Sequence, residues 1–165
     1  MKGAVKSLGI VNIFVKIYFC GSIRGAPADR ELYRHLIDHL HSHGEVLTEH
    51  SFFRTLSEEH RVEDRWIWET DTGWLRESDA VIAEITAPSH GVGYEIGFAE
   101  SLRKPILCLY RTQMGRRASA MLTGNMNVEV YEYGTRENAC KIIDEWLQGL
   151  RGGKPSRFSS ASAIR

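Results

Sequence analysis

Residues 80–100, AVIAEITAPSHGVGYEIGFAE, decide the fold of this chain. The first six residues are apolar except for Glu84, which predicts a buried strand. A turn rich in serine and glycine follows, and then a segment predicted to be a helix that ends near Arg103, before Pro105. Such a turn lies at the carboxyl edge of its strand, where open α/β sheets bind their ligands.

The helix that follows this turn carries Glu95 in its first turns. Glycines such as Gly91 let backbone N–H groups approach a ligand, and the start of the helix favours an anion. Two interpretations of Glu95 stay open at this point. It is a catalytic carboxylate beside the ligand, or it is an acidic residue that the helix dipole stabilises.

A second turn of the same kind follows residues 15–19, VKIYF, which alternate around Lys16 and are predicted to form the first strand. The turn reads CGSIRG, and Pro27 then occupies an expected first helical position. Backbone N–H groups, Ser22 and Arg24 could cradle a phosphate here. The turn matches neither a P-loop nor GxGxxG, so an ordinary strand-to-helix turn is an equal alternative.

The remaining chain alternates between predicted strands and predicted helices. Further strands are expected at 45–48, 105–110 and 128–131, and helices at 28–43, 61–77, 118–122 and 136–150. Gly44 is interpreted as the stop signal of the first helix, and a bend is expected near Gly73. This alternation predicts an α/β three-layer sandwich with a five-stranded parallel sheet, Rossmann-like or flavodoxin-like.

Two further residues are candidates for a site. His50 follows the end of a predicted strand, so it lines the site or merely ends the strand. Asp71 precedes Trp74 and Leu75 on one helical face, and a carboxylate on an inward face needs a partner or a task. The three tryptophans of this helix are predicted to belong to the core or to an interface.

Composition narrows the classes of partner. The chain has 165 residues and a formal net charge of zero, which favours one domain and no nucleic-acid partner. Its three cysteines show no CxxC or Cys/His spacing, so no metal site is predicted. Reduced thiols fit the cytoplasm or the nucleus.

The predicted domain comprises residues 15–150, preceded by an extension at 1–14 and followed by a basic tail at 151–165. The extension is too short to span a membrane, and no cleavage site of a signal peptide follows it. No membrane contact is therefore expected. The tail is rich in Gly, Ser and Arg, and it is predicted to be disordered.

Five motifs in their order resemble one family. They are KIYFCGSIRG at 16–25, VLTEH at 46–50, DAVIAE at 79–84, PSHGVGYE at 88–95 and SAM at 119–121. Together they resemble the 2'-deoxynucleoside 5'-monophosphate N-hydrolases of the nucleoside 2-deoxyribosyltransferase family. The resemblance covers roughly residues 16–150 and leaves out both termini.

The resemblance implies the reaction and the roles of its residues. Glu95 resembles the nucleophile that forms a covalent glutamyl-deoxyribosyl intermediate, Asp71 the acid that assists departure of the base, and Tyr18 the residue that orients the nucleophile. Ser119 resembles a serine that the other subunit of a homodimer contributes to the phosphate pocket. The implied substrate contacts are Gly21, Ser22, Ile23, Arg24, Gly25, His50, Ser89, Gly91, Ser119, Ala120 and Met121. No cofactor and no metal is implied.

Three alternatives remain beside this interpretation. A deoxyribosyltransferase would pass the sugar to a second base, but it would have no use for the phosphate contacts. A hydrolase of ribonucleotides such as CMP is compatible with the sequence, because contacts to the 2' position cannot be assigned. A non-catalytic nucleotide sensor would not need two carboxylates beside an anionic ligand, since they would repel the phosphate.

Overall fold

Five parallel strands form the centre of the protein. We describe residues 15–23, 29–48, 62–112 and 116–152 of a computed structural model. The strands are β1 (Val15–Gly21), β2 (Gly44–Val46), β3 (Ala80–Glu84), β4 (Ile106–Arg111) and β5 (Glu129–Tyr133). They lie in the order β2-β1-β3-β4-β5, and every neighbouring pair is parallel. This order is that of the flavodoxin-like folds, and it confirms the predicted fold class.

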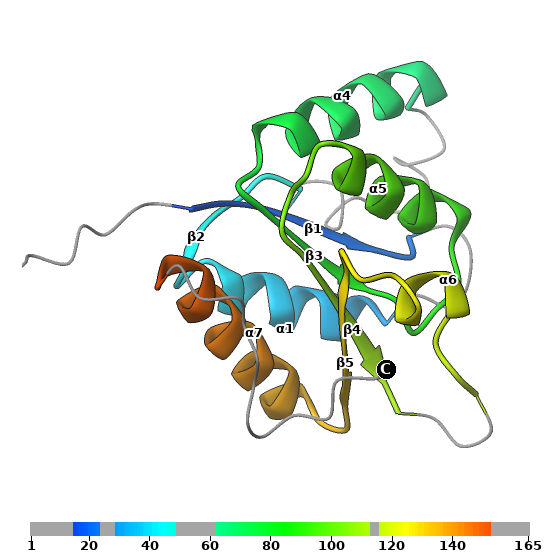
Figure 1. The fold of residues 1–165 in the computed structure, drawn as a ribbon. Helices are drawn as coiled ribbons and strands as arrows, with labels where there is room; N and C mark the ends of the chain where they lie inside the picture. The colour runs from blue at the N-terminus through cyan, green and yellow to red at the C-terminus, as the bar shows by residue number, and fades with distance from the viewer. Residues whose placement is uncertain (1–14, 24–28, 49–61, 113–115, 153–165) are drawn as a thin grey trace, which may run out of the picture.

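Helices cover both faces of this sheet and make three layers (Figure 1). One face carries α1 (Arg30–Leu40) and α7 (Arg136–Arg151). The other face carries α4 (Asp64–Glu77) and α5 (His90–Ser101), and the short α6 (Ala120–Thr123) precedes β5. Because α7 continues through Arg151, the last helix ends one residue later than predicted.

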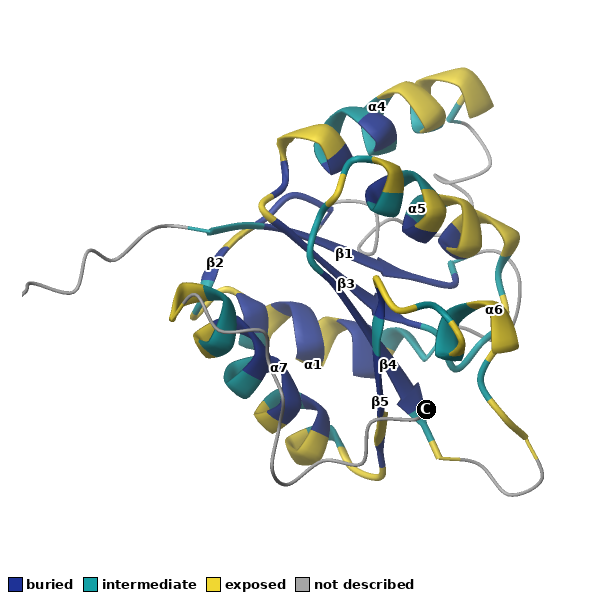
Figure 2. Ribbon diagram, in the orientation of Figure 1, coloured by how far each residue is buried: buried dark blue, intermediate teal, exposed yellow. Residues whose placement is uncertain are grey.

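Two apolar clusters fill the spaces between the layers. Side chains of β1 alternate between them, since successive residues of a strand point to opposite faces. Ile17 and Phe19 pack with α1 and α7, whereas Tyr18 and Cys20 belong to the cluster beneath α4 and α5. The strands are buried, and the outward faces of the helices are exposed (Figure 2). Tyr18 and Cys20 therefore face the helices that carry Asp71 and Glu95.

The start and the end of α1 have different causes. Asp29 caps its first turn, because its carboxylate accepts a hydrogen bond from the N–H of Leu32 at 3.0 Å. The helix ends at Leu40, and Gly44 is the first residue of β2, paired with Val15. A Cβ atom on Gly44 would lie 1.9 Å from the carbonyl oxygen of Val15. The prediction of Gly44 as a helix stop was wrong: the close approach of two strands requires this glycine.

One prediction about α4 was also wrong. The helix runs without interruption through Gly73, since one glycine costs a helix only about 1 kcal/mol. Trp66 and Trp68 are 44% and 51% exposed, so of the two predicted places, core or interface, only an interface remains for them. Trp74 is partly buried and packs against the cluster beneath α4 and α5.

Several predictions fall outside the described residues. They concern the extension at 1–14, Pro27, residues 49–61 and the tail beyond Gly152. Among the described residues, no helix has the length and the apolar composition that would let it cross a membrane.

Candidate active site

Glu95 lies in the second turn of α5, above the carboxyl half of β1. The helix begins because Ser89 adopts an extended conformation and its hydroxyl accepts a hydrogen bond from the N–H of Val92 at 3.4 Å. This cap fixes where the helix leaves β3. Two residues of β1 then meet the Glu95 side chain, because the Tyr18 hydroxyl and the Cys20 thiol both donate hydrogen bonds to its carboxylate. The site lies between β1 and β3, where the strand order reverses and ligands bind in this class of sheet.

The surroundings of Glu95 change its ionisation. Burial raises the pKa of Glu95 from 4.5 to about 7, and the nearby charge of Asp71 acts in the same direction. The hydrogen bonds from Tyr18 and Cys20 oppose this rise, since they stabilise the ionised form. Glu95 is thus a carboxyl group that titrates near neutral pH, which suits a group that takes part in a reaction.

Tyr18 and Cys20 stay protonated donors. Burial raises the pKa of the Tyr18 hydroxyl well above its usual value, and the charge of Glu95 raises it further. The same two causes, in the same order, raise the pKa of the Cys20 thiol. Both groups therefore hold a proton that they can point at the Glu95 carboxylate.

Asp71 and Glu95 line the same two hollows. One, of about 200 Å³, also has the aromatic rings of Trp68 and Tyr94 in its wall. The indole N–H of Trp68 donates a hydrogen bond to the Tyr94 hydroxyl at 3.1 Å. The other, of about 20 Å³, includes Tyr18, Cys20, Gly21 and Ile23. The structure thus brings together the two carboxylates singled out from the sequence and places an aromatic wall beside them.

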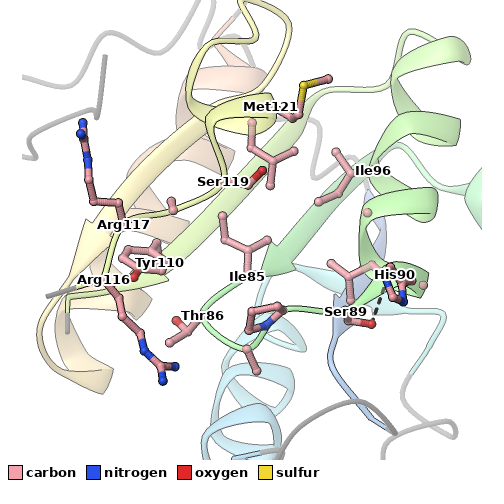
Figure 3. Close-up of a pocket in the computed structure, with 17 residues that line it drawn as sticks. Ile85, Thr86, Ser89, His90, Ile96, Tyr110, Arg116, Arg117, Ser119 and Met121 are labelled. Carbon is pink, nitrogen blue, oxygen red and sulfur yellow. Dashed lines mark hydrogen bonds between the residues drawn. The ribbon is translucent and has the colours of Figure 1, made fainter. Parts of the chain in front are cut away.

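A larger pocket of about 890 Å³ opens next to this pair of carboxylates. Figure 3 shows Ser89 and His90, from the start of α5, on one side of it and Arg116 and Arg117, from the segment before α6, on the other. Gly91 lines both this pocket and the 200 Å³ hollow, so the two spaces adjoin. Hydroxyl groups, the start of a helix and guanidinium groups form a surface that suits a phosphate.

The other predicted substrate contacts differ in where they lie relative to this pocket. Ser119 and Met121 line the large pocket within a single chain, and Ala120 does not contribute to its lining. Ser22 is buried, and its hydroxyl finds no hydrogen-bond partner among the described residues. A buried hydroxyl in this state costs about 1–3 kcal/mol, which a ligand oxygen would offset. Arg24, Gly25 and His50 lie outside the described residues.

Three features of the site did not emerge from the sequence. Cys20 is one, because only the pairing of β1 with α5 gives its thiol a carboxylate partner. Arg116 and Arg117 are another, although two arginines just before the SAM motif were a visible signal.

The third is Glu84, a buried carboxylate at the end of β3. It accepts hydrogen bonds from the hydroxyls of Tyr133 at 2.9 Å, Tyr33 at 3.5 Å and Thr86. Burial raises its pKa. These bonds fix the end of β3 immediately before the turn to α5. One acidic residue in an otherwise apolar run was the signal for it.

Comparison of the sequence with known proteins finds one family. Residues 17–139 match the family model described as nucleoside 2-deoxyribosyltransferase. The 5-hydroxymethyl-dUMP N-hydrolase of Rattus norvegicus is 42% identical over 153 residues, which cover 89% of this chain and 93% of that protein. The human 5-hydroxymethyl-dUMP N-hydrolase is 47% identical over 138 residues, which cover 80% and 79%.

A solved structure supports the fold. The CMP N-glycosidase of Clostridium botulinum superimposes with a TM-score of 0.56 at 20% identity, covering 78% of this chain and 98% of that chain. At this identity the likeness speaks for the arrangement of strands and helices alone.

Proposed function

Because this chain belongs to the nucleoside 2-deoxyribosyltransferase family, we propose that it hydrolyses the N-glycosidic bond of 2'-deoxynucleoside 5'-monophosphates. The products are a free base and 2-deoxyribose 5-phosphate. One observation carries the proposal: a carboxylate titrating near pH 7, held by Tyr18 and Cys20, lies beside a second carboxylate and next to a pocket lined by hydroxyls and arginines.

In this reaction the ionised Glu95 attacks the anomeric carbon of the sugar as the bond from that carbon to the base breaks. The base leaves with the bonding electrons and takes a proton from Asp71, so that a glutamyl ester of the sugar remains. Asp71, ionised by that step, then takes a proton from a water molecule that attacks the anomeric carbon and displaces the Glu95 carboxylate. The sugar phosphate is released, and both carboxyl groups return to their starting states. Two carboxyl groups with these roles are the pattern of a retaining glycoside hydrolase.

The proposed orientation of the substrate follows from the two adjoining spaces. The 5'-phosphate lies in the 890 Å³ pocket, near Ser89 and the two arginines. The sugar lies over Gly91 and beside Glu95. The base lies in the hollow walled by Trp68 and Tyr94, where an aromatic ring can stack.

The names of the relatives suggest the base. Since the rat and human relatives are named for 5-hydroxymethyl-dUMP, we propose this modified pyrimidine nucleotide as the preferred substrate.

We further propose that the protein is a homodimer in which Ser119 reaches the phosphate pocket of the partner. Trp66, at 44%, and Met121, at 81%, are exposed large apolar side chains that such an interface would cover. The motif SAM at 119–121 resembles the family motif whose serine the other subunit contributes, and this resemblance is the motive for the proposal.

The test is to incubate the purified chain with 5-hydroxymethyl-dUMP, the ordinary deoxynucleoside monophosphates, CMP and the unphosphorylated nucleosides, and to measure free base by chromatography. We expect release from the deoxynucleoside monophosphates and little from nucleosides. Glu95→Gln should reduce turnover by several orders of magnitude, as loss of a nucleophile does, while the protein remains folded.

Each alternative predicts a different result. Equal turnover of nucleosides would refute the phosphate pocket, and formation of a new nucleoside from an added base would indicate a transferase. Faster release from CMP would indicate a ribonucleotide hydrolase. Tight binding of monophosphates without turnover would favour the sensor.

A further inference from the structure

We propose that His39, His43 and Asp144 form a zinc-binding site that joins α1 to α7. These helices cover the face of the sheet opposite α4 and α5, so the site is separate from the candidate active site (Figure 1). The proposal does not depend on the proposed function. It revises the sequence-based prediction that the chain holds no metal site.

The three side chains converge on one point. His39 Nε2 lies 2.6 Å from Asp144 Oδ1, and His43 Nε2 lies 2.7 Å from the same oxygen. The two imidazole rings have centroids 5.5 Å apart and an interplanar angle of 63°. One ligand atom from each residue lies within 4.8 Å of the other two, and no other trio of this kind occurs in the part of the chain that the structure describes.

Helix geometry explains the convergence. His39 and His43 are four residues apart, a spacing that puts two side chains on the same side of a helix. Although α1 ends at Leu40, residues 41–43 form hydrogen-bonded turns directly after it, in which the N–H of His43 donates to the Leu40 carbonyl at 2.9 Å. Asp144 lies in the middle of α7, which packs along α1.

The facing positions continue one turn earlier along both helices. There His35 Nε2 lies 3.7 Å from the sulfur of Cys140, four residues before His39 and Asp144 respectively. Two successive facing pairs show that the packing of the two helices places His39 and His43 opposite Asp144. The arrangement does not depend on the conformation of a single flexible side chain.

The ligand set suits Zn²⁺. Neutral imidazole nitrogen and carboxylate oxygen are ordinary zinc ligands, at about 2.0–2.2 Å from the ion. In a tetrahedral site such ligand atoms lie about 3.3 Å apart, so the nitrogen–oxygen distances would open by about 0.6 Å when the ion replaces the hydrogen bonds. Each imidazole would present the Nε2 lone pair and keep its proton on Nδ1.

Partial exposure leaves room for the ion and for water. The side chains of His39, His43 and Asp144 are 27%, 12% and 37% exposed. Three protein ligands are thus held in place, and a fourth position remains open to a water molecule. Since Zn²⁺ would bind the folded chain and link residues far apart in sequence, it should stabilise the fold.

The experiment uses the full chain without an affinity tag, stripped of metal with a chelator, and titrated with Zn²⁺ by calorimetry. We expect one ion per chain and a rise in the melting temperature. Co²⁺ in place of Zn²⁺ should give the intense visible absorption of a tetrahedral complex. His39→Gln and Asp144→Asn should each weaken Zn²⁺ binding about tenfold or more, whereas His41→Gln, an exposed histidine on the adjoining turn, should bind as the unmodified chain does.

Asp144→Asn keeps the size of the side chain and an oxygen acceptor for both histidines, so it separates metal binding from folding. Circular dichroism verifies the fold of each variant. Absence of saturable Zn²⁺ binding to the unmodified chain would overturn the proposal. So would binding that His39→Gln and Asp144→Asn leave unchanged, or that His41→Gln weakens equally.

Discussion

Glu95 illustrates how the fold sets the chemistry of one residue. Its side chain is partly buried between α5 and β1, near Asp71, and its pKa is about 7 because the loss of solvent outweighs the two hydrogen bonds that it accepts. A carboxylate that is a nucleophile must be ionised. The rate of the proposed reaction should therefore follow the titration of Glu95.

We predict a bell-shaped dependence of kcat/KM on pH, because Glu95 must be ionised and Asp71 protonated, and this ratio reports the ionisation of the free enzyme. Cys20→Ala removes a donor that favours the ionised form, so the rising part of the profile should move to higher pH. Cys20→Ser keeps a donor and serves as the matched control. A profile that moves equally in both variants would show that the thiol hydrogen bond does not set this pKa.

The same shift has a consequence for stability. The folded pKa of about 7 lies above the unfolded value of 4.5, so Glu95 stabilises the fold below pH 4.5 and loses this contribution as the pH rises through 7. The loss is on the order of 1–3 kcal/mol. Glu95→Gln has no such pH-dependent contribution. Urea unfolding should therefore show that, from pH 5 to pH 8, the free energy of unfolding of the unmodified chain falls relative to that of the variant.

At the scale of elements, two glycines differ in their surroundings: one lies where β1 packs on α1, and the other lies on α5. A Cβ atom on Gly21 would lie 2.9 Å from the ring carbon Cζ of Tyr33, which belongs to a buried ring on α1. A Cβ atom on Gly97, within α5, would meet nothing within 4 Å. The first glycine makes room for another element, and the second does not.

We predict that Gly21→Ala destabilises the protein by about 1–3 kcal/mol, since the added carbon forces a shift at the end of β1. Gly97→Ala should stabilise it by roughly 0.5–1 kcal/mol, because alanine loses less freedom in a helix than glycine. Denaturant unfolding of both variants measures the two effects. A neutral Gly21→Ala would mean that Tyr33 moves aside without cost.

At the scale of the molecule, the exposed apolar side chains call for a partner surface. Trp66, Trp68, Tyr94 and Met121 are all more than two-fifths exposed, on α4, α5 and α6. The proposed homodimer would cover part of this surface. The homodimer bears on function through Ser119. This residue lines the large pocket of its own chain, and in the proposed dimer it reaches the phosphate pocket of the partner.

We predict that mixing inactive Glu95→Ala chains with Ser119→Ala chains restores part of the activity. If Ser119 acts in the partner's site, one site of each hybrid dimer then holds both intact residues. Subunit exchange followed by the base-release assay measures this. A monomer by light scattering, or no recovery after demonstrated exchange, would place Ser119 in the site of its own chain.

The sequence by itself determined the parallel α/β fold, because strand and helix periodicities alternate along the chain and adjacent βα units have few ways to pack. It also indicated Tyr18, Asp71, Glu95 and Ser89, since they belong to motifs short enough to be recognised locally. The tertiary structure decided what depends on distant contacts. Gly44 serves strand pairing with Val15, α4 continues without interruption through Gly73, and the Cys20 thiol meets Glu95. His39 and Asp144 are 105 residues apart and meet only because α1 and α7 pack side by side.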